Sequence, residues 1–382
     1  MRIKDRNIVI INQAVNYLTI GLANEFKKKF KNVVLITGSV HVQGEELNKN
    51  IDICKISKWN ETHGISKVII YFKALVSIWY LLMTKYKNYE VFFISSPPMG
   101  YLLNIVLPHR CSMLIWDVFP DTFKITGMQL SHPVYRVWST LNKSSFKKSY
   151  RLFTIGDEMA GLLSQYIDKN KIIVQPIWSI FQKNDKISKM ENKFIKNNNL
   201  ESYFIVQYSG NIGLTHKVEV MVTLAEKMQD HDNILFQIIG RGPRKNTLKQ
   251  FVIEKSLKNC QFLPFQSDEM FPSSLSAADL GIVILDETTS KGSVPSKSYN
   301  LMSYGIPSLY IAASDSELQN YADKFEHGKC FSENELDKAE EFILKLSKNK
   351  EYYKKLSSNS EKAASNFKRE NAAKFVEKYL NA

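Results

Sequence analysis

The sequence is poor in cysteine, which argues against a zinc-stabilised domain and against a disulfide-stabilised domain. It has four cysteines in 382 residues, and they lie far apart at Cys54, Cys111, Cys260 and Cys330. Most of them fall within apolar, strand-like runs, where a reduced thiol behaves as a small hydrophobic side chain. The spacing fits neither a zinc site nor a disulfide framework, so we expect a reduced, cytosolic protein.

Long apolar runs are missing as well. The N-terminus reads MRIKDRNIVIINQ, and its apolar stretch is too short for a signal peptide. The most apolar segment, residues 68–83, is shorter than the roughly 20 residues that span a bilayer, and Lys73 interrupts it. It predicts a core helix packed on a sheet or, alternatively, a helix partly buried in a membrane interface beside Lys67, Lys85 and Lys87.

The glycine pattern of a dinucleotide-binding enzyme is absent from the start of the chain. Residues 7–37 predict a strand, a helix and a second strand, but the turn between them lacks G-x-G-x-x-G. This absence argues against a dehydrogenase.

Acidic residues are outnumbered by basic ones. The chain has 51 Lys and Arg against 38 Asp and Glu, which gives a formal net charge of +13. Such a charge fits an anionic partner, whether a nucleotide, a nucleic acid or an acidic membrane surface. Because no recognisable nucleic-acid-binding module occurs, we do not expect a nucleic acid.

The length and the alternation of segments predict an α/β protein of two domains. With 382 residues, 44% of them hydrophobic, the chain can form two cores. Apolar, strand-like runs alternate with helix-like segments in both halves, a pattern typical of parallel sheets. We expect domains at 1–178 and 201–365, a polar linker at 179–200, and a C-terminal helix within 366–382 that packs back on the first domain.

Two expected strands of the first half end in residues suited to a binding site. Pro97 and Pro98 form a rigid turn after the first, and Asp117 and Asp121 follow the second. Both turns would lie at the carboxyl edge of the sheet. The two aspartates could hold an acceptor, take part in proton transfer or cap the next helix. Capping is the commoner role for Asp121, and Asp117 is the better functional candidate.

The stretch KGSVPSKSYNLMSYG, residues 291–305, predicts an anion site in the second half. It places small residues, a proline and Lys297 where a helix should begin. The free N–H groups of a first helical turn attract phosphate, and the lysine adds a full charge. The alternative is a capped surface helix whose lysine is solvated.

Three further loops should reach the same edge. In YSGNIG, glycines allow close approach of a ligand to the backbone, while Asn211, His216 and Lys217 supply donors. The alternative there is a plain tight turn. The other two loops are IGRGP, and the residues after CQFLPF, which could embrace a nucleobase.

With these residues in hand, the second half resembles the donor domain of the GT-B glycosyltransferases. The closest resemblance is to the retaining family 4 group that builds bacterial capsule and O-antigen sugars. YSGNIG resembles that group's YxGNxG loop, IGRGP its GxGP turn, AADLGIVIL its "aD" strand and VPSKSYNLMSYGIP its VPSKxYExMAxGxP signature. In the first half, SSPP and WDVFPD resemble its SPP and QDLWPD segments. The implied fold is GT-B, two Rossmann-like doubly wound domains facing a cleft.

The resemblance also implies the site. Catalytic roles fall on Asp117, His216 and Lys297, and the acceptor side on Pro97, Pro98, Asp117 and Asp121. The donor would be bound by Gly210, Asn211, Gly213, Arg241, Gly242, Phe265, Gln266, Ser293, Val294, Ser296, Lys297 and Asn300.

Two departures from the family pattern concern acidic residues. Asn300 replaces a glutamate that usually binds the ribose hydroxyls, and Gly292 stands where the family-wide Glu-x7-Glu pair would begin. The loss at Gly292 is usual among the VPSK relatives. The change at Asn300 bears on ribose binding and on the identity of the donor.

The expected function is therefore that of a retaining glycosyltransferase. The donor would be a UDP- or GDP-sugar, and the acceptor would be an undecaprenyl-diphosphate-linked saccharide. The protein would be cytoplasmic and would attach to the anionic surface of the membrane's inner face. The leaving phosphate would itself take the acceptor's proton, and cationic groups would stabilise it without a metal or cofactor. The alternatives are a nucleotide-sugar epimerase of the same fold, for which we find no clustered acid and base residues, and an inactive membrane-associated scaffold.

Overall fold

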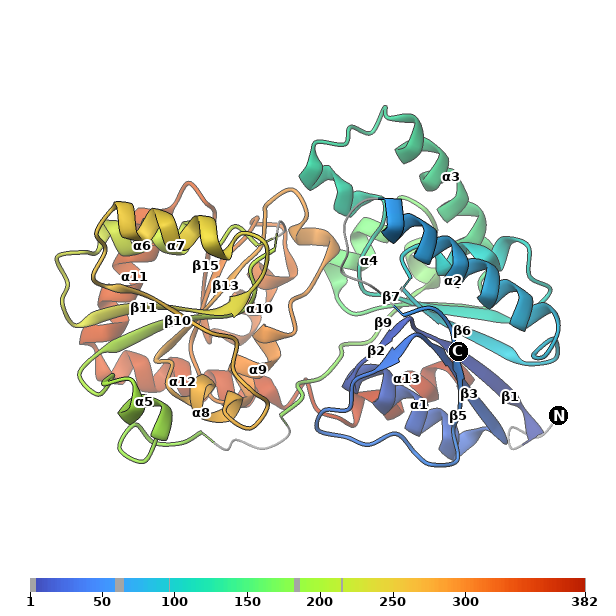
Figure 1. The fold of residues 1–382 in the computed structure, drawn as a ribbon, viewed down its shortest axis with the longest axis horizontal. Coiled ribbons are helices and arrows are strands. Elements are labelled where there is room, and N and C mark those ends of the chain that lie inside the picture. Colours follow the sequence, from blue (N-terminus) through green and yellow to red (C-terminus); the bar gives the residue numbers. More distant parts are fainter. Residues whose placement is uncertain (1–4, 59–64, 96, 182–185, 214–215, 382) are drawn as a thin grey trace. The chain divides into compact units, whose positions relative to one another are not determined.

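A computed structural model describes residues 5–58, 65–95, 97–181, 186–213 and 216–381 of the chain (Figure 1). The chain divides into two compact units. The first comprises Met1–Ile180 together with Arg369–Ala382, and the second comprises Phe181–Lys368.

The first unit is built on a parallel sheet of seven strands. Its order is β5-β3-β1-β6-β7-β8-β9, so the chain changes direction across the sheet between β1 and β6. The strands are β1 (Asn7–Ile11), β3 (Asn32–Thr37), β5 (Asp52–Lys55), β6 (Glu90–Ile94), β7 (Cys111–Ile115), β8 (Arg151–Thr154) and β9 (Ile172–Val174). The central strands are almost entirely buried because helices cover both faces. A short pair, β2 (Ala14–Val15) and β4 (Ser39–Val40), lies apart from this sheet.

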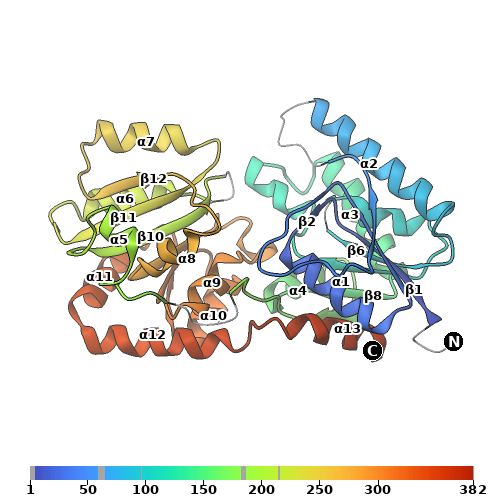
Figure 2. The same ribbon diagram turned by 60° about the horizontal axis from the view of Figure 1, so that its bottom comes forward.

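The helices of the first unit begin and end on local signals. The Asn16 side chain accepts hydrogen bonds from two backbone N–H groups and so caps the start of α1. The helices are α1 (Tyr17–Lys29), α2 (Ile65–Met83), η2 (Gly100–Ile105), η3 (Asp121–Thr126), α3 (Pro133–Lys148), α4 (Asp157–Leu163), η4 (Lys169–Lys171) and α13 (Asn371–Asn381). Figure 2 shows α13 running beside α1, although the two are far apart in sequence.

The second unit has a parallel sheet of six strands in the order β12-β11-β10-β13-β14-β15. Here the direction of winding reverses between β10 and β13. The strands are β10 (Phe204–Asn211), β11 (Ile234–Arg241), β12 (Cys260–Leu263), β13 (Leu280–Ile284), β14 (Ser308–Ile311) and β15 (Gly328–Phe331). The helices are α5 (Lys193–Asn197), α6 (Glu219–Lys227), α7 (Lys245–Glu254), α8 (Phe271–Ser276), η5 (Ser290–Gly292), α9 (Lys297–Ser303), α10 (Glu317–Phe325), α11 (Leu336–Lys348) and α12 (Lys350–Ala364). Both units are thus doubly wound α/β domains, as predicted.

The polar stretch expected as a linker at 179–200 belongs mostly to the second unit. Phe194 and Ile195 of α5 are buried, and with Leu200 they form a core cluster with strand residues of the second sheet. The unit boundary falls at Ile180, and residues 182–185 lie outside the described part. The linker prediction was wrong over most of its range because two apolar side chains in a polar sequence suffice to anchor a short helix.

The apolar segment 68–83 forms most of α2, and only one stripe of it is buried. Ala74, Ile78 and Leu82 recur every four residues and are 0% exposed. The opposite stripe is open, with Phe72 65% and Tyr80 61% exposed. The expectation of a core helix was therefore only half right. No helix in the described ranges is long and apolar enough to cross a membrane.

The C-terminal helix α13 is an integral part of the first unit's core. Phe375 is 1% exposed and its ring lies 5.5 Å from that of Phe153 on β8. Arg369, just before the helix, donates to the Gly21 carbonyl oxygen at 3.1 Å and pairs with Glu45. The first domain therefore needs the last residues of the chain.

Replacing Phe375 should unfold the first unit more easily. We expect Phe375→Ala to lower the free energy of unfolding by about 3–5 kcal/mol, because a large buried ring is lost and a cavity remains. Glu377 on the same helix is exposed, so Glu377→Ala should change it by less than about 0.5 kcal/mol. Urea denaturation followed by circular dichroism measures both, and equal losses for the two variants would show that α13 does not pack as described.

Candidate functional site

The carboxyl edge of the second sheet gathers the loops that the sequence singled out. These loops follow β10, β11, β12 and β13, and β10 and β13 are neighbours at the point where the winding reverses. Open α/β sheets leave a crevice at such a point, outside the carboxyl ends of the strands. The first residue of α9, Lys297, follows the loop after β13.

The two glycine turns after β10 and β11 pack backbone against backbone. A Cβ on Gly240 would lie 2.0 Å from the carbonyl oxygen of Gly210. A Cβ on Gly242, which has φ 151°, would lie 2.4 Å from the carbonyl oxygen of Ile212. Neither position tolerates a side chain, so glycine at both positions lets the two turns pack closely against each other.

Asn211 and Arg241 are paired residues at the ends of β10 and β11, and both side chains are exposed. The Asn211 amide nitrogen would lie 3.0 Å from a Cβ on Gly213, so this glycine makes room for it. The Arg241 guanidinium lies 4.9 Å from the ring centre of Phe265, which is 54% exposed. This cation–π pair presents a charged guanidinium and the exposed part of an aromatic ring next to each other.

Lys297 is the most unusual group in the unit. Its Nζ is excluded from solvent, has no hydrogen-bond partner among the described residues, and lies 3.9 Å from the ring centre of Tyr208. It also lies 3.1 Å from where a Cβ on Gly210 would be, so it reaches the turn after β10. Burial lowers the pKa of Lys297 to about 7. An unpaired amine held at a turn of exposed backbone can bind an anion.

His216 lies in the same electrostatic environment. Its Nδ1 is 3.1 Å from the carbonyl oxygen of Ile284 at the end of β13. Because a carbonyl oxygen only accepts, Nδ1 carries the proton and Nε2 of the neutral ring remains an acceptor. Burial, and then the charge of Lys297, lower the pKa of His216 to about 4. The ring is thus neutral at pH 7.

The start of α9 holds the remaining donor candidates of the PSK turn. No side chain among the described residues caps this helix at Ser296, which is exposed. Ser293 is half-buried, Val294 is 6% exposed, and Asn300 is half-buried one turn further on. Gln266, in the loop after β12, donates to the carbonyl oxygen of Pro264 at 2.6 Å.

Sequence reasoning missed an acidic cluster beside these loops. Lys217 was expected to be a free donor, but its Nζ lies 2.9 Å from Asp286 and 2.9 Å from Glu333. Burial raises the pKa of Asp286, but hydrogen bonds from Thr288 and Lys217 outweigh this and hold it below its usual range. Asp286 follows β13, so the signal that selected Asp117, a polar residue at the end of an apolar strand, would have found it.

In the first unit, the two aspartates have different environments. Burial raises the pKa of Asp117 to about 7. Asp121 is 4% exposed, accepts from Tyr135 at 2.8 Å and from Tyr166 at 2.6 Å, and pairs with Lys124 at 2.7 Å. It occupies the first position of η3 and is not the cap. These contacts engage Asp121 within the first unit, and its place on the acceptor side stays a prediction.

Pro97 and Pro98 keep their expected position after β6. Pro97 is buried and Pro98 is half-buried, and the chain continues into η2. Asp117 follows the neighbouring strand β7. The first unit therefore brings these three residues to the carboxyl ends of two adjacent strands.

The described ranges contain no group of three or more His, Cys, Asp or Glu side chains arranged to hold a metal ion. The cationic groups near the loops of the second unit are Lys297, Arg241 and the start of α9. They could stabilise a polyanion by hydrogen bonds and charge.

Comparison with protein families finds a match for most of the second unit. Residues 189–363 match the family described as glycosyl transferases group 1. The matched segment includes every loop of the carboxyl edge described above.

Two curated bacterial proteins are similar over part of the chain. WcaI of Escherichia coli K12, assigned as a colanic acid biosynthesis glycosyl transferase, is 30% identical over 32% of this chain and 30% of its own length. WbjE of Pseudomonas aeruginosa, assigned as a glycosyltransferase, is 23% identical over 58% of this chain and 56% of its own length. The matches thus span between about a third and just over half of these relatives.

Solved structures match nearly the whole chain at low identity. The Anabaena protein Alr3699/HepE, in complex with UDP and glucose, has a TM-score of 0.72 and 12% identity, covering 98% of this chain and 99% of its own. WaaG, a glycosyltransferase involved in lipopolysaccharide biosynthesis, has a TM-score of 0.72 and 13% identity, covering 98% and 100%. The likeness confirms the predicted GT-B fold, while membership of family 4 and the VPSK signature stay predictions.

The burial of an unpaired lysine should cost stability. We expect Lys297→Met to raise the free energy of unfolding by about 1 kcal/mol or more at pH 7, because methionine fills the site without a charge to desolvate. The pKa of Lys297 is about 7 folded and near 10.5 unfolded. Wild-type stability should therefore rise between pH 7 and 10.5, and the advantage of the variant should shrink over that window.

Urea denaturation at several pH values from 7 to 9.5 measures this difference. Lys291→Met serves as the control, because the Lys291 side chain is 44% exposed and pairs with Asp315 at 2.5 Å. A Lys297→Met protein less stable than wild type across the whole range would contradict the description of Lys297 as an unpaired buried amine.

Proposed function

We propose that this chain is a glycosyltransferase that uses a nucleotide-sugar donor and binds the donor's diphosphate at the carboxyl edge of the second unit. One observation carries the proposal. The Lys297 Nζ is excluded from water, has no hydrogen-bond partner in the part of the chain that the structure describes, and lies against Gly210 at the end of β10, where the sheet's winding reverses. The match of residues 189–363 to glycosyl transferases group 1 supports it independently.

The arrangement suits the departure of a nucleoside diphosphate. Negative charge builds on the leaving phosphate as the bond to the sugar breaks, and fixed cationic groups stabilise it most where water is excluded. Lys297 and Arg241 supply the charge, and the backbone around Gly210 allows a close approach. We propose that these groups act without a metal ion, and that the phosphate takes the acceptor's proton so that the sugar's configuration is retained.

The base and the sugar bind around the diphosphate in this proposal. The open ring of Phe265 offers a flat surface for the base, and His216 presents an acceptor nitrogen to a sugar hydroxyl. Asn300 takes the place of the family's ribose-binding glutamate and can both donate and accept hydrogen bonds. UDP and glucose in the HepE structure make a UDP-sugar the first donor to test, with GDP-sugars second.

On the acceptor side, we propose a role for Asp117. A carboxyl group with a pKa of about 7 can donate or accept a hydrogen bond at neutral pH, which suits the orientation of a sugar hydroxyl. A matching transferase from Caldicellulosiruptor saccharolyticus, 25% identical over 56% of this chain, acts on a pyrophosphoryl-undecaprenol substrate by its name. We therefore propose a lipid-linked saccharide acceptor.

Sugar transfer provides the test of function. Thermal shifts with UDP and GDP identify the base, because a ligand that binds the folded state raises its apparent stability. Radiolabelled sugars of that nucleotide are then assayed with excess EDTA. We expect transfer or hydrolysis by wild type, a loss of roughly 100-fold in Lys297→Met, and little change in Lys291→Met. Activity only with added Mn²⁺ or Mg²⁺ contradicts the metal-free proposal, and no nucleotide binding at all contradicts the function.

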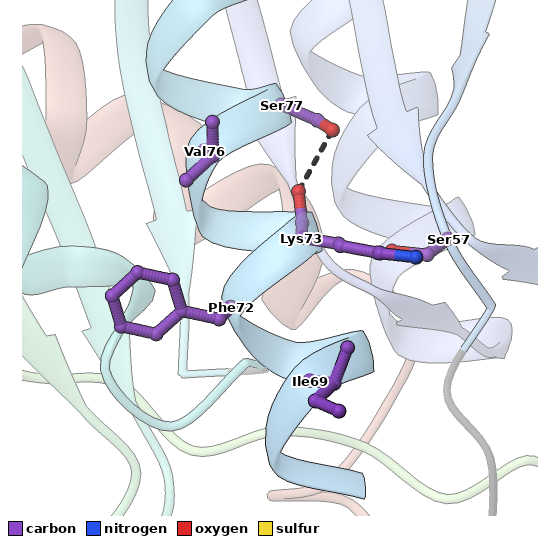
Figure 3. Close-up of a pocket in the computed structure, with 6 residues that line it drawn as sticks. All are labelled: Ser57, Ile69, Phe72, Lys73, Val76 and Ser77. Carbon is purple, nitrogen blue, oxygen red and sulfur yellow. Dashed lines mark hydrogen bonds between the residues drawn. The ribbon is translucent and has the colours of Figure 1, made fainter. Parts of the chain in front are cut away.

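A lipid-linked acceptor requires contact with a membrane, and α2 is suited to it. Phe72, Val76 and Tyr80 form an exposed stripe at four-residue spacing, between 53% and 65% open. The helix contains no acidic residue, and Lys73, Lys85 and Lys87 are exposed on or near it. Ile69, Phe72, Lys73 and Val76 are among the residues that line a pocket of about 690 Å³. In Figure 3, Phe72 and Val76 project from one side of α2, and Lys73 projects from the other side toward Ser57. We propose that this stripe docks on the anionic cytoplasmic face of the membrane.

Co-sedimentation with liposomes tests the docking. We expect binding to anionic vesicles at low salt, weaker binding at high salt, and a loss of about tenfold or more in Phe72→Ser/Tyr80→Ser, because apolar area no longer enters the interface. Ile253 of the second unit is 59% exposed, so Ile253→Ser controls for the loss of an exposed apolar side chain. Wild-type protein that stays in the supernatant at low salt excludes the membrane and favours a soluble acceptor.

A further inference from the structure

Tyr208, a core residue of β10, makes two contacts that reach the proposed anion site. Its side chain is 0% exposed and belongs to the unit's main core cluster. One face of the ring lies 3.9 Å from the Lys297 Nζ. Its hydroxyl donates to the backbone carbonyl oxygen of Asn211 at 2.6 Å.

The Tyr208 ring makes a cation–π contact with the Lys297 ammonium. The face of an aromatic ring is electronegative and attracts an ammonium, most strongly where water is excluded. Because no described residue forms a hydrogen bond with the Nζ, we expect its position to depend on packing and on this ring. Gly210 also lies against the Nζ, with only 3.1 Å between the Nζ and the position of a Cβ on this glycine.

The hydroxyl fixes the turn that follows the strand. The bond to Asn211 holds the carbonyl at the end of β10, and the next residue, Ile212, donates from its N–H to the Arg241 carbonyl oxygen at 2.8 Å. Burial raises the pKa of Tyr208, so the hydroxyl stays protonated and keeps donating. The turn after β10 and the end of β11 are thereby held in one register.

We infer that Tyr208 is a positioning residue for the nucleotide, with its ring placing the Lys297 ammonium and its hydroxyl placing the Asn211 turn. This inference rests on the proposed function, because it assumes that the two groups bind the donor's diphosphate. Tyr208 itself does not touch the ligand. It acts through Lys297 and through the backbone of Asn211. Its hydroxyl can be removed with the ring kept, or the ring and hydroxyl can be removed together.

Tyr208→Phe and Tyr208→Leu separate the ring from the hydroxyl. Tyr208→Phe keeps the ring under Lys297, so we expect the affinity for UDP or GDP to fall only about threefold, from the loosened turn. Tyr208→Leu removes the ring, and we expect a fall of about tenfold or more. Calorimetric titration of the full chain with whichever nucleotide binds wild type gives both values.

The pH profile distinguishes positioning from a general loss of packing. Without the ring the ammonium is less stable, so the pH above which affinity declines should move to lower values in Tyr208→Leu and stay in place in Tyr208→Phe. Tyr310→Leu, which also removes a fully buried tyrosine from this sheet, should leave the profile unchanged. If Tyr208→Leu does not fold, Tyr208→Met fills more of the space and carries the same test.

A double-mutant cycle completes the experiment. In a Lys297→Met background, Tyr208→Leu should reduce the affinity by only about threefold, the effect of the lost hydroxyl on the turn, because the ring then has no ammonium to place. Two results overturn the inference, provided that wild type binds nucleotide. One is a Tyr208→Leu effect on affinity that is as large in the Lys297→Met background as in wild type, and the other is the same pH profile of affinity for all Tyr208 variants. Failure of wild type to bind any nucleoside diphosphate overturns the proposed function instead.

Discussion

The site depends on one costly arrangement, an unpaired amine removed from water. Across the described ranges the Lys297 Nζ finds no hydrogen-bond partner, and burial lowers its pKa to about 7. Folding would favour an apolar side chain at that position. In the proposed function the arrangement becomes favourable when a diphosphate binds, because the amine then gains both its proton and its partner. The neighbouring Lys217, by contrast, is already neutralised by Asp286 and Glu333.

The fold supplies what such an amine needs. Winding that reverses between β10 and β13 opens the sheet edge, and backbone contacts at Gly210, Gly240 and Gly242 keep the floor of the edge free of side chains. Tyr208 joins this floor to the core. The same topology in the first unit brings Asp117 to a sheet edge, where burial raises its pKa to about 7. Both units thus carry titrating groups at strand ends, with opposite charge when ionised.

The sequence predicted what depends on local pattern and missed what depends on partners distant in the chain. Strands buried on both faces, such as β13, read as continuous apolar runs, and the glycine turns and Lys297 stand in short recognisable motifs. The prediction of a linker over 179–200 was wrong because Phe194 and Ile195, which are buried, stand isolated in a polar stretch and give no periodic pattern. The even apolarity of α2 concealed which face is buried. The partners of Asp121 and Lys217 were missed because Tyr135, Tyr166 and Glu333 come from distant segments of the chain.

Proton uptake on nucleotide binding tests the central claim most directly. UDP or GDP is titrated into the protein calorimetrically at pH 8, in buffers with different ionisation enthalpies. At this pH Lys297 is mostly neutral in the free protein, and the diphosphate should restore its charge. The account predicts uptake of most of one proton per nucleotide by wild type and none by Lys297→Met. Tight binding by wild type with no net proton uptake would contradict it.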